Sequence, residues 1–242
     1  NGRISQHGLL VGRRYDANPA DKQTVLTYAA VLRKLRQSAQ AVAVLQREAA
    51  RSPDDLDVLG AYGKALADAG RYPEAAEVLS RAHTPERPNW SILSAQGSVA
   101  DRLGEHAQAQ GFYDAALKIM PDEPSVLSNL GLSYALSRDL QRAEDVSRRA
   151  ADLPQADQRV RQNYALVLAL RGKFYEAEEV ARRDLRPEEA AQNIAEIRAS
   201  IAQSDTWKAV RQSQNETAPR VIVSTVPRAT SAPAAPALRK GL

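Results

Sequence analysis

Histidine and cysteine, two residue types that often perform catalysis or bind metal, are sparse or absent in this chain of 242 residues. Cysteine is absent, which removes thiolate metal sites, disulfides and a cysteine nucleophile. The histidines His7, His83 and His106 lie far apart and have no partners at ligand spacing. No phosphate-binding loop or nucleophile-elbow motif occurs. We therefore expect no enzyme activity, no metal and no cofactor, and binding remains as the class of function.

The clearest pattern is a recurrence of small residues every 34 positions. Gly63, Gly97 and Gly131 form one such column, and Gly70 and Gly104 belong to a second. Two further columns contain Ala75, Ala109, Ala143 and Ala177, and Pro19, Pro53 and Pro121. This pattern resembles the tetratricopeptide repeat (TPR), a pair of antiparallel helices. It predicts an all-α fold, a right-handed superhelical solenoid of such pairs.

The repeat register divides the chain into four parts. Residues 1–21 match the second helix of a truncated repeat, and residues 22–186 match five full repeats. Residues 187–213 carry apolar side chains three and four positions apart, which predicts an amphipathic capping helix. Residues 214–242 are rich in Pro, Ala, Ser and Thr and contain basic residues, which predicts a disordered tail.

Two glycine columns have distinct physical causes. The column of Gly63 and Gly97 is expected where the two helices of a repeat approach most closely. Gly70 and Gly104 are expected to end the first helix in a left-handed backbone conformation. Arg36 and Arg138 replace glycine at this turn position, so we expect those turns either to absorb some strain or to relax into a different conformation.

The first helices of the repeats are expected to line a concave surface that binds a partner. Repeat positions 2, 5, 9, 12 and 13 face it, and they are small or charged in the N-terminal half. In the C-terminal half they include four leucines, called here the leucine strip: Leu132, Leu136, Leu166 and Leu170. The strip suits an amphipathic helix or an extended apolar peptide, or alternatively packs under the capping helix. The candidate groove residues are Lys64, Ser94, Ser98, Asp101, Arg102, Ser128, Leu132, Leu136, Gln162, Leu166 and Leu170.

Charge and hydropathy limit the kind of partner. The formal net charge is +4, and acidic and basic residues alternate through the predicted helices, as on solvated helix faces. We therefore expect no nucleic-acid partner, although binding through the basic tail is the alternative that strong salt dependence would reveal. No apolar run is long enough to span a membrane. A chaperone-type carboxylate clamp needs Lys, Asn and Arg at repeat positions 5 and 9, and Lys64 is the one such residue in those columns. A clamp is therefore not expected.

Residues 88–186 and 192–210 resemble a narrower family. The segments RVRQNYALVLALRGKFYEAEEVAR and NIAEIRASIAQSDTWKAV are similar to the TadD-type TPR lipoprotein of tight-adherence (Flp) pilus assembly. The resemblance implies an assembly factor, pilotin-like, that binds a peptide or helix of a secretin or another pilus component. It also implies the periplasmic face of the outer membrane, with a lipid anchor upstream of Asn1, where the pattern starts in mid-repeat. The alternative is a cytoplasmic TPR adaptor or co-chaperone-like scaffold.

Overall fold

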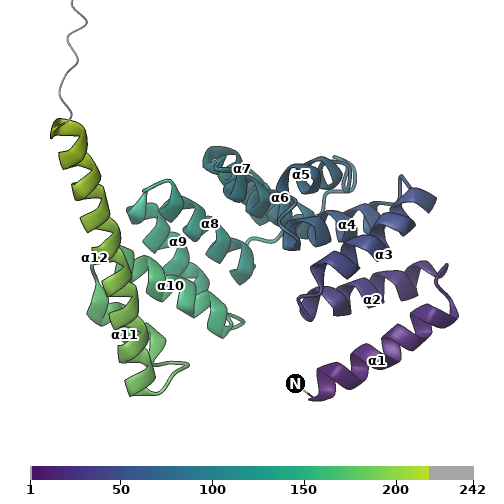
Figure 1. Ribbon diagram of the computed structural model, residues 1–242, viewed down its shortest axis with the longest axis horizontal. Coiled ribbons are helices and arrows are strands. Elements are labelled where there is room, and N and C mark those ends of the chain that lie inside the picture. The colour runs from purple at the N-terminus through teal and green to yellow at the C-terminus, as the bar shows by residue number, and fades with distance from the viewer. Residues whose placement is uncertain (1, 218–242) are drawn as a thin grey trace, which may run out of the picture. The chain divides into compact units, whose positions relative to one another are not determined.

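The protein is described by a computed structural model, which covers the backbone of residues 2–217 and the side chains of residues 10–203. Within that range every regular element is an α-helix, which confirms the predicted all-α solenoid (Figure 1). The chain divides into two compact units, Asn1–Ile201 and Ala202–Leu242. No helix in the described range is both long and apolar enough to cross a bilayer.

The first unit begins with a single helix, α1 (Gly2–Ala17), followed by helix pairs. The pairs are α2 (Lys22–Lys34) with α3 (Ser38–Arg51), α4 (Leu56–Asp68) with α5 (Tyr72–Ser80), α6 (Trp90–Leu103) with α7 (His106–Ile119), α8 (Pro124–Leu136) with α9 (Leu140–Asp152), and α10 (Gln158–Leu170) with α11 (Phe174–Ala181).

The last helix, α12 (Pro187–Thr217), begins at the proline where the capping helix was predicted. It continues past residue 213, where the sequence analysis begins the tail. Residues 218–242 of the predicted tail lie outside the described residues. Ile194 is buried, and Ile197 and Ile201 pack with it against a cluster that includes Leu168 of α10. Residues 187–201 therefore cover the end of the repeat array.

The turns between paired helices show why glycine recurs there. Gly70, Gly104 and Gly172 have φ angles of 76°, 83° and 78°, in the left-handed region that glycine adopts without steric cost. Arg36 and Arg138 occupy the same position with φ angles of 59° and 66°. Of the two outcomes expected for these turns, the structure therefore shows strain, because a side chain disfavours this conformation.

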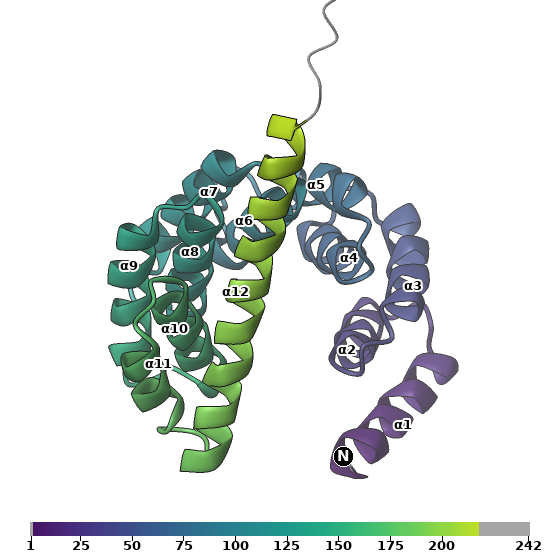
Figure 2. The same ribbon diagram turned by 60° about the vertical axis from the view of Figure 1, so that its left-hand side comes forward.

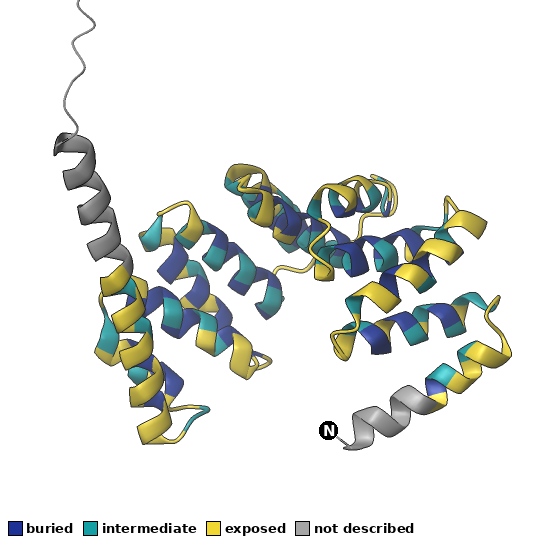
Figure 3. Cartoon of the chain, viewed as in Figure 1, coloured by how far each residue is buried: buried dark blue, intermediate teal, exposed yellow. Residues whose placement is uncertain are grey.

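The other glycine column lies where the paired helices touch. A Cβ atom on Gly63 would lie 2.5 Å from the Leu79 side chain, and one on Gly97 would lie 2.6 Å from the Tyr113 ring. Both distances are far below van der Waals contact, so the absence of a side chain allows the helices to approach. Leu79 and Tyr113 are among the largest fully buried side chains, and Figure 3 shows buried residues in dark blue along the helices of the array.

Within the first unit, the first helix of each pair contacts the first helix of the next. These contacts join α2 to α4, α4 to α6, α6 to α8, and α8 to α10. In Figure 2 these helices lie on the inner side of the array, and the second helices lie on its outer side. Ion pairs between residues 35 positions apart follow the same path, as between Lys22 and Asp57 and between Arg33 and Asp68. The surface of the first helices is therefore continuous along the unit.

Candidate functional site: a groove along the first helices

Three adjoining clefts hollow the inner surface of the first unit. Their volumes are about 600, 750 and 400 Å³, and Arg33 lines all three. Because they share lining residues, they form one groove along the first helices. We call it the cationic groove, after the six basic residues in its wall, which are Arg33, Arg36, Lys64, Arg87, Arg102 and Arg159.

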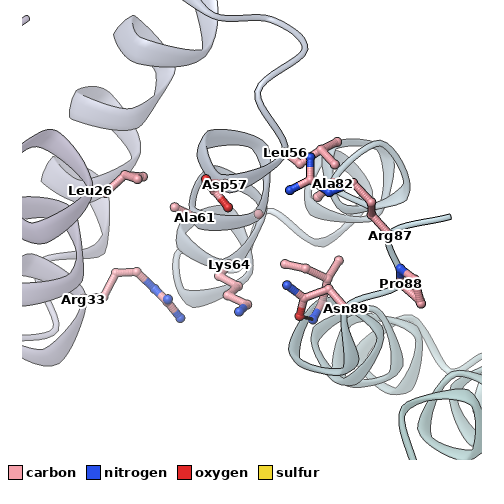
Figure 4. Close-up of a pocket in the computed structure, with 12 residues that line it drawn as sticks. Leu26, Arg33, Leu56, Asp57, Ala61, Lys64, Ala82, Arg87, Pro88 and Asn89 are labelled. Atoms are coloured by element: carbon pink, nitrogen blue, oxygen red, sulfur yellow. Dashed lines mark hydrogen bonds between the residues drawn. The ribbon is translucent and has the colours of Figure 1, made fainter. Parts of the chain in front are cut away.

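The part of the groove between α2, α4 and the start of α6 is drawn in Figure 4. The Arg33 side chain extends from α2 toward the space that Lys64 of α4 also borders. Asn89 lies on the opposite wall, where its side-chain oxygen accepts hydrogen bonds from the backbone N–H groups of Ser91 and Ile92. This cap fixes the start of α6 and so fixes the far wall of the cleft.

The groove has more cationic than anionic groups. Its carboxylates are already paired: Asp68 with Arg33 at 2.5 Å and Asp57 with Lys22 at 2.9 Å. In the part of the chain that the structure describes, Arg36, Arg102 and Arg159 make no ion pair and no side-chain hydrogen bond. These three guanidinium groups, and that of Arg87, which also makes neither contact among the described residues, therefore remain available to a ligand.

Lys64 lies deeper in the wall than these arginines. Its ammonium group donates a hydrogen bond to Ser91 Oγ at 2.8 Å and has no carboxylate partner among the described residues. Burial lowers the pKa of Lys64, and the nearby Arg33 guanidinium lowers it further. An anion bound here would oppose both effects, because a neighbouring negative charge favours the charged ammonium.

Neutral polar side chains line the same wall. Ser94, Ser98 and Asn129 border the cleft with Arg159. The Asn129 amide has no hydrogen bond within the described residues, so its donor and acceptor are available to a peptide backbone. The predicted residues Lys64, Ser94, Ser98 and Arg102 are thus brought together in one groove.

Two of the predicted groove residues have a different role. Ser128 is 2% exposed and accepts a hydrogen bond from Asn163 Nδ2 at 2.9 Å, which joins α8 to α10. Asp101 is also largely buried, with its side chain only 10% exposed. Both face a neighbouring helix at positions that the repeat register assigned to the groove, because successive first helices pack against each other.

Asp101 is the centre of a hydrogen-bond cluster that joins the third and fourth repeats. Its carboxylate accepts from Ser133 Oγ at 2.7 Å and from the Tyr113 hydroxyl at 3.1 Å, and it lies 2.9 Å from His106 Nδ1. Burial, with the neighbouring carboxylate, raises the pKa of Tyr113, so the phenol remains a donor. Asp101 therefore holds α6, α7 and α8 in register.

The leucine strip lies further along the same surface. Leu136 is 57% exposed and Leu170 is 37% exposed, whereas Leu132 and Leu166 are half-buried between the helices. Gln162 is exposed beside them. The capping residues of α12 pack on the cluster that contains Leu168. Apolar area on the strip therefore remains accessible next to the cationic groove.

The described residues contain no group of three or more His, Asp or Glu side chains placed to hold a metal ion. His83 is engaged with Gln96 at 3.0 Å, and His106 is engaged with Asp101. The His7 side chain lies outside the described side chains. What the groove offers is a set of charged, polar and apolar contacts arranged along one surface.

Arg33, Arg36, Asn129 and Arg159 are among the groove residues that were not predicted candidates. Arg33 and Arg159 occupy concave-facing repeat positions, so the register itself could have identified them. Arg36 lies in a turn and Asn129 lies at position 6, where only the approach of neighbouring repeats brings them to the groove. No sequence signal marks those two.

Comparison with known proteins supports the repeat pattern. The family model described as "Tetratricopeptide repeat" matches residues 29–89 and 94–159, just over half of the chain. No curated protein sequence matches closely enough to count as a relative.

Several solved structures have a similar fold. A thermophilic TPR protein of Thermus thermophilus is 20% identical, with a TM-score of 0.64 over 74% of this chain and 98% of its own. PilW, described as a widely conserved type IV pilus biogenesis factor, is 16% identical, with a TM-score of 0.67 over 79% of this chain and 90% of PilW. A MamA protein is 18% identical, with a TM-score of 0.53 over 71% of this chain and 93% of the MamA chain. At these identities the similarity establishes the fold alone.

Proposed function

Because this chain belongs to the tetratricopeptide repeat family, we propose that it acts as a protein-interaction scaffold whose first helices hold a segment of a partner polypeptide. The observation that carries the proposal is the surface of the first helices, where the cationic groove and the leucine strip lie next to each other. It combines guanidinium groups without partners, polar side chains able to bind a peptide backbone, and exposed leucines on one surface. An extended chain or a helix laid along this surface would meet all three kinds of contact.

The more specific proposal is a pilotin-like assembly factor for a tight-adherence (Flp) pilus system. Its support is the resemblance of residues 159–182 and 193–210 to the TadD-type lipoprotein. The same fold in PilW, described as a pilus biogenesis factor, adds a weaker argument. In this proposal the partner is a segment of the secretin or of another pilus component. A lipid anchor upstream of Asn1 would hold the protein at the periplasmic face of the outer membrane.

The scaffold proposal is tested by charging the leucine strip. In Leu136→Glu/Leu170→Glu, both changes are at exposed positions, so the fold should persist while a carboxylate opposes apolar contact. The matched control is Tyr175→Glu, because Tyr175 is 76% exposed on α11, the second helix of its pair. The assay is co-purification of the secretin from cells that carry the pilus system.

We expect the double variant to lose the secretin and the control variant to retain it. Capture that survives the double change would remove the strip from the binding site. If no secretin co-purifies with the unmodified protein, the pilus assignment fails while the scaffold proposal stands.

The alternative is a cytoplasmic adaptor with the same groove, and cell fractionation of the full gene product separates the two. Recovery with the outer membrane, abolished by removal of a lipid-modified cysteine, supports the pilus assignment. Recovery in the cytosol supports the adaptor.

A further inference from the structure

We infer that the segment held by the groove is bipartite, with acidic residues that bind Arg102 and Arg159 and apolar residues that contact the leucine strip. The inference rests on the proposed function and specifies its ligand. It depends on the placement of two chemically different surfaces next to each other on the first helices.

The acidic half follows from the balance of charge in the groove. Six basic residues line it, and the carboxylates of Asp57 and Asp68 are occupied by Lys22 and Arg33. Arg36, Arg102 and Arg159 come from the first, third and fifth repeats, yet they border a single cleft. Like charges gathered without counter-charges repel one another, and an acidic ligand would relieve that repulsion.

The spacing between the two halves follows from α10. Arg159, Gln162, Leu166 and Leu170 are separated by three and four residues, so they lie along one face of this helix. At 1.5 Å per residue, Leu166 and Leu170 lie roughly 10 and 16 Å from Arg159 along the axis. An extended peptide covers about 3.3 Å per residue, so its acidic and apolar residues should be about three to five positions apart.

The groove favours a polypeptide over a nucleic acid. Asp57 and Asp68 interrupt the basic wall, so an unbroken phosphate backbone would be brought against carboxylates. A peptide places its carboxylates singly, and its backbone matches the free amide of Asn129 and the hydroxyls of Ser94 and Ser98.

The chain's own C-terminal segment does not have the required charge. It contains four basic residues and no acidic residue after Glu216, and the basic residues are Arg220, Arg228, Arg239 and Lys240. The same cations in the groove would repel it.

The experiment measures fluorescence anisotropy of labelled peptides with the full chain. The probe peptide contains four glutamates, a spacer of two serines and two leucines, and its counterpart has glutamine in place of glutamate. We expect the glutamate peptide to bind at least about tenfold more tightly at low salt, with the difference shrinking as salt is raised. Equal affinity for the two peptides, or no binding of the glutamate peptide, would overturn the inference.

A matched pair of variants locates the binding. Arg102→Gln/Arg159→Gln removes two groove charges that make no ion pair or side-chain hydrogen bond within the described residues, and it should weaken binding of the glutamate peptide about tenfold. Arg47→Gln/Arg183→Gln removes two exposed charges outside the groove lining and should leave the affinity unchanged. If both double variants weakened the affinity for the glutamate peptide equally, or if neither weakened it, the peptide would bind outside the groove, for example at the basic tail.

Two further outcomes separate the inference from the function. If both peptides bind equally and Leu136→Glu/Leu170→Glu abolishes binding, the scaffold stands and the acidic requirement fails. If a twelve-nucleotide oligothymidylate binds more tightly than the glutamate peptide and Arg102→Gln/Arg159→Gln releases it, the ligand is a nucleic acid, and the inference fails.

Discussion

Adding one methyl group at two glycines of the third repeat should have opposite effects on stability. Gly97 lies in α6 where this helix touches α7, and a Cβ atom there would lie 2.6, 2.8 and 2.9 Å from three atoms of the Tyr113 ring. Gly111 lies on the exposed side of α7, and a Cβ atom there would meet nothing within 4 Å. Comparing the two variants therefore separates the intrinsic helix propensity of alanine from the steric effect of a side chain where α6 and α7 touch.

The size of each effect follows from the surroundings. In Gly111→Ala only helix preference acts, and alanine gains about 1 kcal/mol. In Gly97→Ala the same gain is opposed by overpacking, which costs about 1–3 kcal/mol. Tyr113 is 2% exposed, and its hydroxyl donates to Asp101, so moving the ring also weakens that hydrogen bond by about 1 kcal/mol. The expected net loss in Gly97→Ala is about 2 kcal/mol.

Thermal unfolding followed by circular dichroism measures both variants. For a chain of this length, 1 kcal/mol shifts Tm by about 2–4 °C, so Gly97→Ala should lower Tm by about 4–8 °C. Gly111→Ala should raise it by about 2–4 °C. If both variants raised Tm, the argument that Gly97 is required for helix contact would be refuted.

Three other substitutions test the contacts that hold the repeats together. Glu144→Gln should destabilise the protein by about 2 kcal/mol at neutral pH, because the buried carboxylate forms ion pairs with Arg148, Arg171 and Lys173. Burial acts to raise the pKa of Glu144, but the hydrogen bonds from Lys173 and Arg148 outweigh burial and hold this pKa below 4.5. The difference in unfolding free energy between the variant and the unmodified protein should therefore persist above pH 4.5. It should shrink as the pH falls through the pKa of Glu144 in the folded protein. Arg36→Gly should raise the free energy of unfolding in urea by about 1 kcal/mol, because it relieves a φ of 59°, and a decrease would contradict the strain. Asp101→Asn should lower the free energy of unfolding by about 1–3 kcal/mol, and amide hydrogen exchange should become faster at the junction of α6, α7 and α8. An equal increase in exchange rate across the whole chain would contradict the role of Asp101 at that junction.

The fold was predictable because the repeat imposes the same physical requirement several times. Gly63 and Gly97 are small because a side chain at either position would collide with the second helix of its own repeat. Gly70 and Gly104 allow a left-handed turn, as the register predicted, and Arg36 adopts the same conformation at the same repeat position. Each of these requirements lies within one repeat, so the spacing of residues along the chain was enough to reveal it.

The site was less predictable because its geometry depends on contacts between repeats. Repeat position 12 was assigned to the groove, but Asp101 at that position is enclosed by Tyr113 and Ser133. Conversely, Arg36 and Arg159 are far apart in the sequence and border one cleft only because the helix pairs are curved around it. The curvature arises from the sum of all the packing contacts, and no single column of residues encodes it.

The most direct test of the account is site-specific photocrosslinking of the bound partner in living cells. A photoreactive amino acid replaces either Ser98, which lines the groove on α6, or Gln46, which is exposed on α3 outside it. The account predicts a crosslinked polypeptide from position 98 and none from position 46. Crosslinking from position 46 with none from position 98 would contradict the claim that the first helices bind the partner.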